Sequence, residues 1–390
     1  MFVLQRIGDA LNLSFQMFWQ ILWPLSLGFL LSAVVETLIS KQAISRVLGR
    51  DSARSVALAT TFGAASSSCS YAAVALARSL FSKGATLANA IIFEFASTNL
   101  VFELGLVLVT ILGWQFLGAE LAGGLLMVVL LAVLFRLTLT TRFAGEARQH
   151  AERGLHGRME GHADMDMSVT GGPLVRRLFS SRGLTAISHT YFMNIYSLWV
   201  DLVLGLLIAG ALGAWVPDSV WSALFLKGHG FMSELWGAAV GPLIAMLSFV
   251  CSVGNIPLAA VLWRGGISFG GVIAFVFGDL LIIPILDIYR KYYGRRVTVY
   301  LFAVSYASMA LAGLTVGRIF TLIGSVPSSR NVAVFSTAVS LNLDTVLNAV
   351  FIVVTALLAV HFVRTGGVAM LRMMGSAPDA GAAAHPHHSH

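Results

Sequence analysis

Two short polar segments, each with a cysteine, interrupt apolar runs of the chain. The first is SSSCS, residues 66–70, and the second is CSVGNIP, residues 251–257. Polar groups in hydrocarbon are costly unless protein, water or a ligand satisfies them. Thiols select soft metals and metalloids over Mg²⁺ or Ca²⁺, so both cysteines are candidate metal or metalloid ligands. The candidate substrate contacts are Ser66, Ser67, Ser68, Cys69, Ser70, Cys251, Ser252 and Asn255.

Acidic residues inside the apolar runs offer a second kind of chemistry. Ionisable groups at membrane depth are candidates for proton transfer. Glu94, Thr98, Asn99 and Glu103 have the spacing of roughly one helix face. We expect Glu94 and Asp279 to carry a coupling proton, and Thr98 and Asn99 to contact substrate. The alternative for each acid is a structural cap or ion pair, and for the polar segments it is tight packing of small residues.

The composition identifies the environment of these groups. Of 390 residues, 57% are hydrophobic and 11% are charged, whereas soluble domains carry about 25% charged residues. Apolar runs of ~20 residues recur along the chain, which is typical of a polytopic membrane protein. The net charge of +7 comes from basic residues in a few loops, where they set topology. The lipid bilayer is therefore a partner, and nucleic acid is not.

The two cysteine segments belong to an internal repeat. The stretch that begins CSYAAVALA at Cys69 aligns without a gap with CSVGNIPLA, so Cys69 pairs with Cys251 in the register of the repeat. Further pairs match in the same register: Gly84 with Gly266, Phe93 with Phe275, and Ser97 with Asp279. The chain therefore contains two related halves.

The basic loops indicate how each half crosses the membrane. Basic residues cluster at 41–54, 78–83, 140–182 and 290–296. These clusters share the cytoplasmic side only if residues 55–80 form a helical hairpin that enters and leaves on one side. By the same reasoning, residues 236–263 form a hairpin that enters from outside. The alternative is that both segments are plain spans.

The predicted fold is an all-α polytopic membrane protein built from two inverted repeats. Each repeat has three transmembrane helices and a broken helical hairpin, and one further helix follows, a plan common among secondary transporters. The expected divisions are a first repeat at 1–139, a cytoplasmic hydrophilic loop at 140–183, a second repeat at 184–323, a C-terminal transmembrane helix at 324–365 and a disordered tail at 366–390.

Three stretches resemble a known family. FVCSVGNIPLAAVLWRGG, FEFASTNLVFELG and FGDLLIIPILDIYRKYYG are similar to the predicted permease family that includes the ArsP-type organoarsenical efflux permeases, over about residues 15–360. The resemblance implies a multi-pass permease of the bacterial inner membrane that exports trivalent organoarsenicals or related compounds in exchange for protons. The chain departs from the family where Tyr71, Ala72, Ala75, Val253 and Asn255 replace its usual residues. The resulting lower thiol count weakens the expectation of arsenic specificity but not of transport.

Together these observations predict a secondary active permease, not an enzyme, that exports a soft-metal, metalloid or organoarsenical-type compound with proton coupling. No cofactor is expected, and the sequence lacks a phosphate-binding G-x-x-x-x-G-K-[ST] motif for ATP. One alternative is a thiol–disulfide electron carrier that uses Cys69 and Cys251. The others are a channel and a membrane scaffold. A homodimer is left open.

Overall fold

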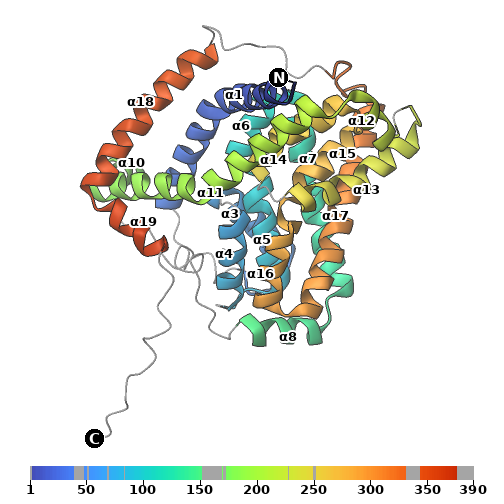
Figure 1. Cartoon of the computed structure of the whole chain (residues 1–390). Coiled ribbons are helices and arrows are strands. Elements are labelled where there is room, and N and C mark those ends of the chain that lie inside the picture. The colour runs from blue at the N-terminus through green and yellow to red at the C-terminus, as the bar shows by residue number, and fades with distance from the viewer. Residues whose placement is uncertain are drawn as a thin grey trace, which may run out of the picture.

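The computed structural model is that of an all-α polytopic membrane protein (Figure 1). It describes residues 2–38, 48–50, 52–67, 70–82, 84–151, 169, 173–226, 228–248, 252–330 and 343–375. Within these residues the regular elements are helices and no strand occurs. Five segments of these residues are long and apolar enough to cross a membrane, one of them made by two successive helices over Leu87–Ile111, and one bent pair of helices makes a sixth. The predicted fold class is confirmed, while the inverted relation of the repeats stays a prediction.

The helices follow one another in two similar series. The first series is α1 (Phe2–Leu38), α3 (Ala53–Ser66), α4 (Ser70–Ser82), α5 (Leu87–Asn99), α6 (Phe102–Ile111) and α7 (Trp114–Thr138). Two short helices connect the series, α8 (Thr141–Ala151) and α10 (Leu174–Leu178). The second series is α11 (Ser181–Trp215), α12 (Asp218–Leu224), α13 (Phe231–Ser248), α14 (Ser252–Gly265), α15 (Phe269–Val276), the 3₁₀ segment η1 (Phe277–Leu281), α16 (Ile283–Tyr293) and α17 (Arg295–Leu322). The chain then forms α18 (Leu343–Arg364) and α19 (Gly367–Gly375).

The local structure repeats in the predicted register, which pairs Cys69 with Cys251. α4 begins at Ser70 and α14 at Ser252. The turns that follow contain Gly84 with a φ of 112° and Gly266 with a φ of 115°, in a region where side chains with a Cβ are strained. A matched N-cap hydroxyl, which accepts from the amide three residues on, then starts the next helix in each half: Thr86 and Ser268.

Equivalent helices of the two halves pack against each other in opposite directions. In the α1–α11 pair, the Ser14 hydroxyl donates to the Leu206 carbonyl at 2.9 Å, and the Trp215 indole donates to the Arg6 carbonyl at 2.9 Å. Residue numbers rise along α1 as they fall along α11, so the pair is antiparallel. The α7–α17 pair is antiparallel too, because the end of α7 lies beside the start of α17 and the start of α7 beside its end.

The two ends of each hairpin segment meet. The Thr86 amide and the Asn89 side chain, which follow α4, donate to the carbonyl of Leu48, which precedes α3, at 3.1 and 2.9 Å. In the second half, the hydroxyl of Ser268, which follows α14, donates to the carbonyl of Glu234 in the first turn of α13 at 3.4 Å. The chain thus returns to its starting point, as a hairpin requires.

Basic residues from several predicted clusters gather at one end of the molecule, where α8 lies beside α4 and α16 (Figure 1). The Arg78 guanidinium stacks on the Tyr292 ring at 4.5 Å and donates to the Ala151 carbonyl at 3.0 Å. Arg148 donates to the Ala85 carbonyl at 3.1 Å. The positive-inside argument for a hairpin requires the basic clusters to share one side of the membrane. Arg78 and Arg148, from two of these clusters, lie at the same end of the molecule.

Two apolar runs contain breaks that the sequence analysis did not predict. α5 ends at Asn99 and α6 begins at Phe102, so Glu103 lies on a different helix from Glu94. The two helices together still make one candidate span, Leu87–Ile111, and the shared face of Glu94 and Glu103 stays a prediction. The run 267–288 also divides, and its two parts meet at an angle of 46°. Pro284, in the first turn of α16, lacks the amide that would continue the preceding helix.

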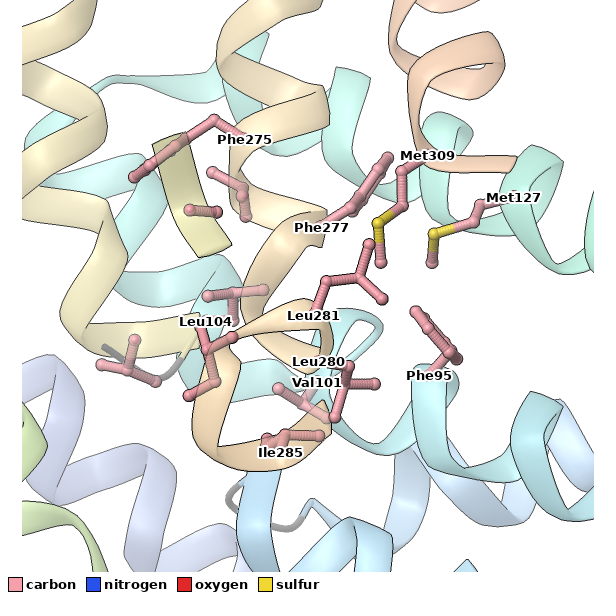
Figure 2. Close-up of a cluster of buried hydrophobic side chains, with 14 of the residues drawn as sticks. Phe95, Val101, Leu104, Met127, Phe275, Phe277, Leu280, Leu281, Ile285 and Met309 are labelled. Atoms are coloured by element: carbon pink, nitrogen blue, oxygen red, sulfur yellow. The ribbon is translucent and has the colours of Figure 1, made fainter. Parts of the chain in front are cut away.

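Apolar side chains enclose this second break (Figure 2). Phe277 and Leu281 of η1 pack with Phe95, Met127 and Met309, and all five are buried. Such surroundings exclude water, so a polar group placed among them needs a partner.

Candidate substrate and proton site

A buried carboxylate, Asp279, joins both hairpins. The hydroxyl of Ser70 donates to its Oδ2 at 2.7 Å, and the side-chain amide of Asn99 lies 3.4 Å from its Oδ1. The side chains of Thr98 and Ser252 also lie close enough to interact with this carboxylate. Asp279 and these four residues are at most 4% exposed. One carboxylate therefore connects the start of α4, the start of α14 and the end of α5.

The local sequence explains why the carboxylate lies here. Asp279 belongs to η1, between the end of α15 and the start of α16, where a helix break leaves backbone groups that small polar residues help to satisfy. The preceding residue is Gly278, at which a Cβ would collide with the Ala245 Cβ and lie 3.2 Å from the Pro242 Cα. Glycine thus lets η1 approach α13 closely.

Five of the predicted site residues come together in this cluster: Ser70, Thr98, Asn99, Ser252 and Asp279. Three other predicted residues, Ser68, Cys69 and Cys251, lie outside the residues that the structure describes. Each of these cysteines directly precedes in sequence one of the two serines that lie beside Asp279.

The remaining predicted substrate contacts bond elsewhere. The Ser66 hydroxyl donates to the Gly63 carbonyl at 3.0 Å, and Ser67 donates to the carboxylate of Glu103 on α6. Asn255 accepts a hydrogen bond from Ser248 at 3.0 Å. Ser66 and Asn255 thus form hydrogen bonds within their own hairpin segments, and Ser67 bonds to α6. The structure records no hydrogen bond from these three side chains to Asp279.

Glu94, the second predicted proton carrier, has a partner of its own. Its Oε1 accepts a hydrogen bond from the phenol of Tyr289 on α16. Glu94 is fully buried and interacts electrostatically with Asp279. The structure therefore places both predicted proton carriers in one buried polar region, with separate sets of donors.

Sequence reasoning missed Tyr289 and Glu120 as members of this region. Glu120 is 1% exposed on α7 and interacts electrostatically with Asp279. It is an acid inside an apolar run, the kind of signal that identified Glu94, so it was available to the sequence analysis. Tyr289 gave no such signal, because its partner lies 195 residues away in the chain.

The polar region has unused hydrogen-bonding capacity. Buried atoms without a partner include Glu94 Oε2, Asn99 Oδ1, Glu120 Oε1, the Asn255 side-chain nitrogen and the Tyr293 hydroxyl. Unsatisfied buried polar atoms are rare and call for an explanation such as a ligand, ion or catalytic role. In the described part of the chain, no three His, Cys, Asp or Glu side chains are grouped so that they could hold a metal ion.

A cavity lies near these carboxylates, but Glu94, Glu120 and Asp279 do not line it. That cavity, of about 810 Å³, lies between α3, α5 and α7, and its polar lining comes from Ser52, Thr60, Thr61, Asn89 and Arg136. Because Asp279 and its donors are buried, a cargo molecule reaches them only after the hairpins or their neighbours move.

Replacing Tyr289 with Phe should lower the apparent melting temperature of the purified protein in detergent. The change removes the hydrogen bond to Glu94 and leaves a buried carboxylate unpaired, which costs about 1.5–3 kcal/mol. Tyr293→Phe is the matched control, because the Tyr293 hydroxyl is buried without a partner and its loss should be neutral or stabilising. Equal shifts in the two variants would contradict the assigned bond.

Comparisons with known proteins agree with this picture of a transporter. The model of the ArsP_1 family, described as a predicted permease, matches residues 6–318. The chain is also 54% identical over 343 residues to Putative permease Rv2963 of Mycobacterium tuberculosis, covering 88% of this chain and 84% of that protein. No solved structure matches the chain. The chain therefore belongs to the ArsP_1 family of predicted permeases, and it is a multi-pass membrane permease.

Proposed function

We propose that this permease is a secondary active exporter of a soft-metal, metalloid or organoarsenical-type compound in the bacterial inner membrane, with transport coupled to protons. Cargo binds between the hairpin tips, and Glu94 and Asp279 carry the proton. The proposal rests on one observation above all: Ser70 and Ser252, at equivalent positions of the two halves, both lie beside Asp279, and the Ser70 hydroxyl donates to it.

This bonding couples the site to the conformation of both halves. Protonation of Asp279 removes a charged acceptor, and charge-assisted hydrogen bonds are roughly twice as strong as neutral ones. A proton or a cargo group on Asp279 therefore changes how firmly the hairpins are held together. A ligand that interacts differently with two conformations shifts the balance between them.

The antiparallel crossings of α1 with α11 and of α7 with α17 support an inverted relation of the two repeats. Rocking of one such repeat against the other exposes a midplane site to each side in turn. The basic end that contains Arg78 and Arg148 then faces the cytoplasm. The proposed cargo chemistry rests on the thiols of Cys69 and Cys251, next in sequence to the two serines.

The test is a transport assay in inside-out vesicles with an acid lumen. We expect methylarsenite to accumulate in the lumen and the accumulation to collapse with the pH gradient, whereas vesicles without the protein accumulate none. Arsenite and Cd²⁺ extend the panel to metalloid and soft-metal ions. A channel would only equilibrate the probe, and a redox carrier would cycle Cys69 and Cys251 between thiol and disulfide. Either result, or no transport of any probe by folded protein, would reject the proposal.

A further inference from the structure

Glu120 is a buried acid for which the proposed function has no use. It lies in α7, whose remaining residues between Trp114 and Leu134 carry no charge. Its side chain is 1% exposed, and Oε1 has no hydrogen-bond partner. An unpaired carboxylate in a membrane interior is strongly destabilising, so such residues persist mainly where they function.

The packing of α7 brings Glu120 to the break that contains Asp279. Gly123, one helical turn beyond Glu120 on the same face, would place a Cβ 3.0 Å from the Phe277 ring. Phe277 lies two residues before Asp279 in η1. The close approach allowed by this glycine explains why the charges of Glu120 and Asp279 interact.

Most other ionisable groups around the pair have their own partners or lie at the surface. Among the elements packed on α7, α15 has no ionisable side chain, Glu94 of α5 bonds Tyr289, and Glu103 of α6 bonds Ser67. The ionisable groups of α17 are Arg295, Arg296, Tyr300, Tyr306 and Arg318. Tyr300 forms a hydrogen bond with Thr138, and Tyr306 donates to a backbone carbonyl. Arg318 forms an ion pair with Glu234.

The elements packed on η1 add few further groups. α13 contributes Glu234, and α14 contributes the exposed Arg264. α16 contributes Asp287, the basic residues of its last turn and three tyrosines, Tyr289, Tyr292 and Tyr293, of which Tyr293 has a buried hydroxyl without a partner. Asp287 pairs at the surface with Arg290 and Lys291. In the described residues, hydroxyl and amide groups supply the hydrogen bonds of Asp279, and no ion pair with it occurs.

We propose, on the basis of the proposed function, that Glu120 and Asp279 share a single transported proton. When the hairpins are joined, the surrounding hydroxyl and amide groups stabilise the Asp279 carboxylate and Glu120 holds the proton. When the hairpins separate and the donors leave, the proton passes from the Glu120 carboxyl to the Asp279 carboxylate, and the total charge of the pair is unchanged. Two carboxylates that interact strongly titrate as one unit in this way.

The internal repeat indicates how many protons the Glu120–Asp279 pair carries in one transport cycle. In the register that pairs Cys69 with Cys251, Glu120 corresponds to Phe302 and Asp279 to Ser97. Neither acid therefore has a counterpart in the other half. The protein contains one such pair rather than two, so the pair accounts for one proton per transport cycle.

The test is infrared spectroscopy of the carboxyl C=O stretch during a pH titration of the full-length protein, which requires no knowledge of the cargo. In Asp279→Asn, the titration midpoint assigned to Glu120 should move by about one pH unit or more, since coupled groups interact by at least that much and the Asp279 charge acts on Glu120. Glu120→Gln identifies the Glu120 band. Glu146→Gln, an acid of α8, is the control and should leave the midpoint unchanged.

A Glu120 midpoint that is the same in wild type and in Asp279→Asn would overturn the shared proton. Asp279→Glu, which keeps the charge, should restore the coupling, so a midpoint shift that Glu does not reverse would also count against it. Vesicle transport separates the two proposals. If wild type accumulates no probe, the proposed function fails whatever the spectra show, whereas pH-driven transport with an unchanged midpoint rejects the shared proton alone.

Discussion

Vesicles that carry Asp279→Asn are expected to accumulate no cargo above passive equilibrium, although the variant folds. Asn keeps an acceptor for the Ser70 hydroxyl but cannot exchange a proton. A carrier without its coupling proton has no energy source for accumulation. One mismatched hydrogen bond in the buried cluster costs about 1–3 kcal/mol, which a folded membrane protein tolerates. Accumulation under an imposed pH gradient and the yield of monodisperse protein in detergent measure the two effects.

The matched control is Asp287→Asn. Asp287 belongs to the neighbouring helix α16 and forms ion pairs with Arg290 and Lys291 at 2.8 Å, with its side chain 44% exposed. Exposed pairs of this kind contribute about 0–1 kcal/mol, so both transport and yield should stay near wild type. If Asp279→Asn transports with wild-type pH dependence, Asp279 is structural, and Glu94 becomes the leading candidate for proton coupling.

The sequence predicted those features that depend on local pattern or on the repeat. Apolar runs located the candidate spans, and the cysteine segments fall between α3 and α4 and between α13 and α14, where the predicted hairpins have their breaks. Ser70 and Ser252, chosen from the two polar segments, and Asp279, chosen as an acid in an apolar run, proved to be neighbours. Their convergence depends on the packing of the two halves, in which α1 contacts α11 and α7 contacts α17.

Features that depend on contacts between distant segments were not predictable. The bonds of Tyr289 to Glu94 and of Ser67 to Glu103 join residues whose partners have no fixed spacing in sequence. The interruption of the helix after Asn99 was also missed, because the run from 85 to 112 stays apolar across it. Glu94 and Glu103, on either side of it, have different hydrogen-bond partners.

The crossing of each hairpin with its neighbouring helix shows how the repeat diverged. In the first half, a Cβ at Gly63 of α3 would lie 2.9 Å from the Ala96 Cβ of α5 and would also collide with the Phe93 carbonyl. In the register of the repeat, Gly63 corresponds to Ala245 and Ala96 to Gly278. A Cβ at Gly278 would collide with the Ala245 Cβ. Each crossing thus has room for one methyl group. In the first half this group belongs to Ala96, opposite Gly63, and in the second half it belongs to Ala245, opposite Gly278.

Gly63→Ala should therefore impair both folding and transport, and adding Ala96→Gly should partly restore them. The single change places two methyl groups at a crossing built for one, and overpacking of this kind costs about 1–3 kcal/mol. It also displaces the arm that carries Ser66 and Ser67 to the hairpin tip. The double variant reproduces the arrangement of the second half, but rescue is incomplete because the contact with the Phe93 carbonyl remains.

Apparent melting temperature and pH-driven accumulation, measured for wild type, both single variants and the double variant, give the interaction between the two positions. Ala96→Gly alone should be mildly destabilising, since it removes a buried methyl group from a helix. Gly8→Ala controls for the helix propensity of alanine, because a Cβ at Gly8 meets nothing within 4 Å. Strictly additive effects at positions 63 and 96 would show that the methyl groups do not compete for one space, and the structural equivalence of the two crossings would then be wrong.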